Sequence, residues 1–90
     1  MDNRLLNKIA KALSDATRYR ILRTIISRGE MNCGEVENHF TLSQPTISHH
    51  LKALSDCNLI LVRKEGQRSV FSPNHKIIME YIKLLRKELS

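Results

Sequence analysis

The sequence has 90 residues, enough for one small domain, and its formal net charge of +6 favours a polyanionic partner such as nucleic acid. Its two cysteines are too few for the disulfide scaffold of a secreted protein, and no segment approaches the roughly 20 apolar residues that cross a bilayer. We therefore expect a single domain over residues 1–90 that is cytoplasmic, has no membrane partner and gains buried surface by pairing with a second chain.

Three helices are predicted in the N-terminal half. Residues 4–13 carry apolar side chains at i, i+3 and i+4 spacing, which indicates a first helix. Asp15 is a suitable N-cap for a second helix, and Gly29 is a residue type that commonly follows a helix C-terminus. Asn32 and Glu35 have the spacing of a capping box, which predicts a short third helix from Asn32.

A fourth helix is predicted to begin at Ser43, because a serine hydroxyl caps a helix well and Pro45 is tolerated in the first turn. Asn58 marks its end, since asparagine tolerates the left-handed backbone conformation found there. Two β-prone runs follow, over residues 59–64 and 67–72, and the intervening Glu65-Gly66 predicts a hairpin turn.

The last predicted helix covers residues 75–89 and is opened by Pro73 and Asn74. The chain is therefore mainly α-helical with one small β-hairpin, in the order of four helices, two strands and a fifth helix. Two short helices joined by a tight turn and followed by a hairpin are the parts of a winged helix-turn-helix.

The fourth helix carries the pattern expected of a DNA-reading helix. Ile47, Leu51 and Leu54 form its inward stripe, whereas its N-terminal half presents short polar side chains outward. An ordinary solvated helix face is the alternative interpretation. The adjacent His49 and His50 point in different directions on a helix, which argues against a shared metal ion. The candidate DNA contacts of this helix are Ser43, Gln44, Thr46, Ser48, His49 and Lys52.

The hairpin concentrates positive charge in a part of the chain that otherwise has little of it. Between Gly29 and Val62 the only basic residue is Lys52. This placement suits contacts to DNA phosphates, although basic residues on a hairpin also protect exposed strand edges against aggregation. The candidate contacts of the hairpin are Arg63, Lys64, Gln67 and Arg68.

The chain resembles the ArsR/SmtB family of winged-helix repressors. The resemblance is carried by KALSDATRYRIL, LSQPTISHHLKAL and VRKEGQRSVFS, which stand in the family's order and cover nearly the whole chain. It implies a homodimer joined through the first and last helices, and operator binding that an inducer relieves. It also implies base contacts by Gln44, Thr46, Ser48 and His49, with the hairpin, residues 63–68, on the flanking phosphates. Ala16 replaces a frequent proline, and Thr41 a frequent turn glycine.

The metal sites of that family are not matched. Its best-known site is a Cys-x-Cys pair at the start of the third helix, and Asn32 and Gly34 occupy those two positions here. Its second site uses Asp, His and Glu along the last helix, where this chain offers only His75 and Glu80 at a different spacing. A transition metal needs three or four converging ligands, so we predict no metal and no cofactor.

The two cysteines suit different roles. Cys33 lies in the first turn of the third helix, where the helix dipole can stabilise a thiolate, so it is a candidate thiol switch. Nearby Glu35 opposes a thiolate. Cys57 lies three residues after Leu54 and is interpreted as a small buried apolar residue.

The last helix has an apolar stripe wider than one small core requires, which favours a dimer interface over a wholly intramolecular core. The candidate interface residues are Leu5, Leu6, Ile9, Ile78, Tyr81, Ile82, Leu85 and Leu89. We therefore predict a homodimeric repressor that binds a double-stranded DNA operator. The alternatives are a thiol- or metal-responsive sensor and a winged-helix module that binds protein without DNA. Enzymatic activity is not expected, because no phosphate-binding loop or nucleophile–base pair is recognisable.

Overall fold

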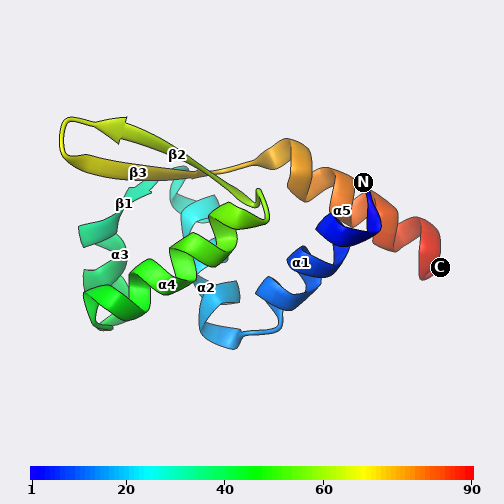
Figure 1. The fold of residues 1–90 in the computed structure, drawn as a ribbon, viewed down its shortest axis with the longest axis horizontal. Coiled ribbons are helices and arrows are strands. Elements are labelled where there is room, and N and C mark those ends of the chain that lie inside the picture. The colour runs from blue at the N-terminus through cyan, green and yellow to red at the C-terminus, as the bar shows by residue number, and fades with distance from the viewer.

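The protein, described over residues 1–90 by a computed structural model, is a winged helix-turn-helix, as the sequence predicts (Figure 1). It measures 41 × 24 × 22 Å, and the hairpin and the last helix extend from opposite ends. The elements in chain order are α1 (Asn3–Leu13), α2 (Ala16–Arg28), β1 (Met31–Asn32), α3 (Cys33–Phe40), α4 (Gln44–Asp56), β2 (Ile60–Glu65), β3 (Arg68–Pro73) and α5 (His75–Glu88).

Side-chain caps explain where the helices begin. The predicted caps of α2, α3 and α4 are confirmed: Asp15, Asn32 and Ser43 each accept a hydrogen bond from the backbone N–H three residues later. Asp2 and Asn74 do the same for α1 and α5. These bonds satisfy N–H groups that have no partner within the helix, and each such cap contributes about 1 kcal/mol.

The sheet has one strand more than the sequence predicts. β1 has two residues, and Met31 pairs with Phe71 of β3, which gives the antiparallel order β1-β3-β2. The hairpin turn is also shifted by one residue, because Glu65 still pairs with Arg68 and the turn is Gly66-Gln67. Gly66 has a φ of 62°, a conformation that glycine adopts without steric cost.

Two residues that are not glycine also have a positive φ, and each lies at the C-terminal end of a helix. Thr41, at the end of α3, has a φ of 54° and begins the turn to α4. It stands at the position where the resembling family often has glycine. Asn58 has a φ of 63° after α4, which confirms the predicted left-handed conformation there. The left-handed conformation costs a β-branched residue such as threonine more free energy than it costs asparagine.

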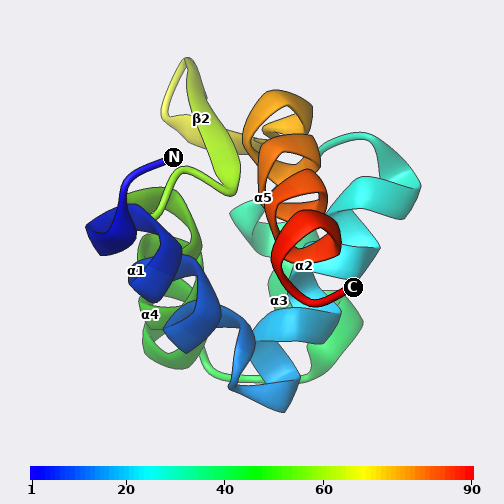
Figure 2. The same ribbon diagram turned by 90° about the vertical axis from the view of Figure 1, so that its right-hand side faces the viewer.

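One hydrophobic cluster of 14 buried residues joins α1, α2, α3, α4 and the sheet. It includes Ile47, Leu51 and Leu54, which confirms the inward stripe predicted for α4. By contrast, no residue of α5 is buried. Figure 1 shows α1 and α5 towards the end of the molecule opposite the hairpin, and in Figure 2 this end faces the viewer. No helix has the length and apolar character needed to span a membrane.

Candidate nucleic-acid interface

The N-terminal half of α4 exposes polar side chains in an ordered arrangement. The Ser43 hydroxyl accepts from the backbone N–H of Thr46 at 3.4 Å and lies 2.9 Å from the Thr46 hydroxyl. Gln44 Nε2 donates to Ser48 Oγ at 2.8 Å. His49 is exposed beside them. The predicted candidates of this helix other than Lys52 therefore lie together at the end that carries the positive helix dipole.

The opposite side of α4 is fixed in the core by apolar packing and by His50. His50 is 8% exposed, and its Nδ1 accepts from Nε of Arg18 at 3.4 Å and lies 3.9 Å from a carboxylate oxygen of Asp15. Burial lowers the pKa of His50 below its ordinary value, and this outweighs the opposing effect of Asp15. The two histidines thus diverge as expected: His50 positions α4, whereas His49 faces solvent.

The wing, which is the β2–β3 hairpin, flanks α4 across a cleft of about 710 Å³. Gln44, Ser48 and Lys52 line it from α4, and Gln67 and Arg68 line it from the wing. Lys52 is paired with Asp56 at 3.1 Å on the α4 surface. The cleft therefore brings five of the predicted contact residues onto one region of the molecule. Lys64 does not line it and is exposed on β2.

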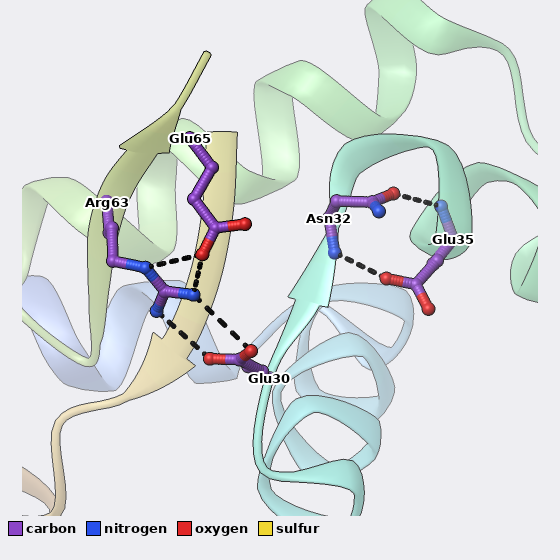
Figure 3. Close-up of polar contacts among 5 residues, drawn as sticks. All are labelled: Glu30, Asn32, Glu35, Arg63 and Glu65. Atoms are coloured by element: carbon purple, nitrogen blue, oxygen red, sulfur yellow. Dashed lines mark hydrogen bonds and ion pairs between the residues drawn. The ribbon is translucent and has the colours of Figure 1, made fainter. Parts of the chain in front are cut away.

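Arg63 differs from the other basic residues of the wing because two carboxylates already bind it (Figure 3). Its Nη1 donates to Glu30 Oε2 at 3.0 Å, and its Nε donates to Glu65 Oε2 at 3.0 Å. These bonds lower the pKa of the Glu30 carboxyl and raise the pKa of the Arg63 guanidinium. The predicted phosphate contact of Arg63 therefore competes with two existing partners.

Strand alternation separates Arg63 from the cleft. Val62 and Ser69 line the cleft, and successive side chains of a strand point to opposite faces. Arg63 and Glu65 consequently lie on the face of the wing that is turned away from α4. Glu30 is not predictable as a partner of Arg63 from local sequence patterns, because the ion pair joins positions 33 residues apart.

Both cysteines are free thiols. Cys33 donates to a carboxylate oxygen of Glu37 at 3.8 Å, and burial together with Glu37 raises its pKa. This direction is opposite to the one that makes a thiol reactive, so the dipole argument for Cys33 is outweighed. Cys57 is 1% exposed and its pKa is raised by burial, which agrees with its interpretation as a small core residue.

Apolar residues of α1 and α5 remain accessible at one end of the molecule. Ile9 is an exception: it is 0% exposed within this chain, so it is a core residue with no surface left for a partner. The apolar stripe of α1 faces partly the core and partly solvent, and its periodicity alone does not distinguish the two sides. Ile82 and Leu89 are 48% and 78% exposed. The remaining predicted interface residues are half-buried: Leu5, Leu6, Ile78, Tyr81 and Leu85.

Comparison with known proteins identifies this arrangement. The family model described as bacterial regulatory protein, arsR family, matches residues 15–61, which run from the α2 cap to β2. The chain belongs to the arsR family. It is 40% identical to the arsenical resistance operon repressor of Staphylococcus aureus over 85 residues, covering 94% of this chain and 81% of that protein.

Solved structures agree with this membership. A crystal structure of an ArsR family transcriptional regulator matches with a TM-score of 0.85 and 25% identity, covering 99% of this chain and 91% of that one. A winged helix-turn-helix domain from Mycobacterium bovis, described as homodimeric, matches the fold with a TM-score of 0.77, 22% identity and coverage of 93% and 80%. As an arsR-family member, the chain is a DNA-binding transcriptional repressor and not an enzyme.

This arsR-family chain has no group of three or more His, Cys, Asp or Glu side chains placed to hold a metal ion. Asn32, at one of the positions where the family has cysteine, caps α3 and accepts from the backbone N–H of Glu35 at 2.9 Å. The side chain of Glu35 in turn accepts from the backbone N–H of Asn32 at 2.9 Å (Figure 3). The predicted capping box is thus confirmed at this position.

Proposed function

We propose that this repressor acts as a homodimer that binds a specific double-stranded DNA operator and is released by an inducer. The observation that carries the proposal is the exposed polar end of α4 beside the cationic wing. Gln44 and its neighbours offer donors and acceptors to base edges in the major groove. Lys64 and Arg68 are exposed cations that suit the phosphates next to that groove.

The proposed dimer joins α1 and α5 of one chain to the same helices of a second chain. Ile77, Ile78 and Tyr81 pack against the core of their own chain, but no residue of α5 is buried by this packing. A second copy would cover the rest of the half-buried stripe. Two copies would also place two α4 helices on one DNA, as in other helix-turn-helix dimers that bind half-sites about one helical turn apart.

The inducer is proposed to act without the cysteine pair of the family, because Asn32 and Gly34 occupy those positions. The protein is accordingly expected to bind DNA with no added metal. Zinc and arsenite are expected to leave the complex intact. Release of the operator by either ion, with matching tight binding in calorimetry, would contradict this part of the proposal.

Selection of bound sequences from random DNA tests the function directly. The winning sequence should contain two related half-sites, and its affinity should exceed that for scrambled DNA by about 10³-fold or more at physiological salt. A protein-binding module without DNA affinity would enrich no sequence. Equal binding to winner and scrambled DNA would refute sequence-specific recognition.

Sedimentation tests the dimer. Leu85→Asp places a carboxylate in the half-buried stripe of α5 and should give monomers or unfolded protein, because an unpaired buried charge is costly. Lys87→Asp puts the same group at an exposed position of α5 and serves as the control. A folded wild-type monomer at micromolar concentration would contradict the dimer.

A further inference from the structure

A second groove lies along α4 on the side away from the wing. It has a volume of about 320 Å³ and is lined by Lys8 and Lys11 of α1, Arg18 of α2, and His49 and Ala53 of α4. Figure 1 shows α4 between the wing on one side and α1 on the other. We call this feature the α1–α4 groove.

The charge of the α1–α4 groove is positive and largely unneutralised. Lys8 and Lys11 are exposed and form no ion pair, since the four ion pairs of the molecule involve other residues. Asp56 is the only carboxylate that lines the groove, and Lys52 already pairs with it at 3.1 Å. A cationic surface whose one carboxylate is already paired suits an anion with several charges.

Arg18 gives the groove a fixed wall. Its Nη1 donates to the carbonyl oxygen of Ala12 at 3.5 Å, and its Nε donates to His50. The guanidinium is therefore held between α1, α2 and α4, whereas the ammonium groups of the two lysines have no hydrogen-bond or ion-pair partner. This division provides one positioned cation and two flexible ones beside the same helix.

The position of the groove relative to the residues of α4 proposed to contact bases indicates which polyanion it would bind. Gln44 and Ser48 line the cleft on the wing side of α4, whereas His49 lines the α1–α4 groove on the other side. The exposed end of α4 is thus a ridge between two cationic surfaces. A helix in the major groove, which is about 12 Å wide, has a phosphate backbone on each side.

We propose that the α1–α4 groove binds phosphates of the DNA strand on the side of α4 away from the wing, with Lys8 and Lys11 as the contacts. The proposal rests on operator binding by α4 and adds a second backbone contact to it. The wing and α1 then hold the two strands that border the same major groove. Contacts of this kind position the protein and carry no base preference.

The test compares Lys8→Gln/Lys11→Gln with Lys83→Gln/Lys87→Gln, which removes the same charge from exposed positions of α5. Each lost phosphate contact lowers the slope of log affinity against log salt by about one unit. The groove variant should lose about four units in a dimer with both grooves engaged, and should weaken on operator and scrambled DNA alike. The α5 variant should keep the wild-type slope.

Ethylation of the DNA phosphates provides an independent readout. Modified phosphates that interfere with the wild type should lose their effect in the groove variant at positions different from those lost in Arg68→Ala. Equal behaviour of the two glutamine variants would overturn the proposal, and so would weaker binding with an unchanged salt slope. Failure of the wild type to bind any DNA would instead refute the proposed function.

Discussion

Gln44 provides the sharpest test of how α4 reads DNA. In the free protein its Nε2 donates to Ser48 Oγ at 2.8 Å on an exposed surface. Water competes for such a bond, so breaking it to contact a base costs little. The amide of Gln44 can then bind adenine through two hydrogen bonds, one donated and one accepted.

The magnitude follows from the number of contacts. A bidentate contact to a base contributes about 1–3 kcal/mol of discrimination, and a dimer has two such contacts on a symmetric operator. Gln44→Ala should therefore weaken operator binding by about 2–6 kcal/mol, which is at least about 30-fold. Binding to scrambled DNA should change little, because that complex depends on phosphates.

The assay measures the affinity of wild type and Gln44→Ala for operator and for scrambled DNA of equal length across a salt series. The slope against log salt should be the same for both proteins, since Gln44 carries no charge. An equal loss on both DNAs would show that Gln44 supports the fold or the backbone contacts rather than reading bases.

Three further changes test the wing, the turn and the buried histidine. Arg63→Ala should leave the salt slope unchanged, and Arg63→Glu combined with Glu30→Arg should restore affinity lost in Arg63→Glu alone; no restoration would indicate a direct phosphate contact. Thr41→Gly should raise the free energy of unfolding by about 0.5–1 kcal/mol in urea denaturation, because relief of the left-handed conformation exceeds the entropy that glycine loses. A lower stability would show that the Thr41 side chain contributes more than its backbone costs. The lowered pKa of His50 means that the unfolded chain binds its proton first, so stability should fall as the pH drops below about 6.5, the ordinary value. The free energy of unfolding of His50→Gln should not show this fall over the same pH range.

Local patterns predicted most of the fold because each helix has its own boundary residue. Asp15, Asn32 and Ser43 cap their helices as expected, and the left-handed conformation of Asn58 follows from its position after an apolar stripe. The strand β1 escaped prediction, since two residues show no alternation. Its existence depends on pairing with Phe71, 40 positions later in the chain.

The surroundings of the candidate site residues were harder to predict wherever a side chain could contact several different partners in the fold. Periodicity placed Ile9 on an apolar stripe but gave no means of telling the core from a partner surface. Charge counts identified Arg63 as basic and Glu30 as acidic without joining them. For Cys33, the helix dipole predicted a lower pKa, whereas burial and the carboxylate of Glu37 raise it.

The short strand β1 sets a fixed distance between the wing and the helix-turn-helix, the two elements that we propose contact DNA. Glu30, just before β1, binds Arg63 of the wing, and Asn32, at its end, both pairs with Val70 and caps α3. The wing and the helix-turn-helix thus share one rigid base. An operator with one extra base pair between the bases under α4 and the flank under the wing displaces that flank by about 3.4 Å. It also turns the flank by roughly a tenth of a helical turn, so the protein should measure the length of its half-site as strictly as it reads its bases.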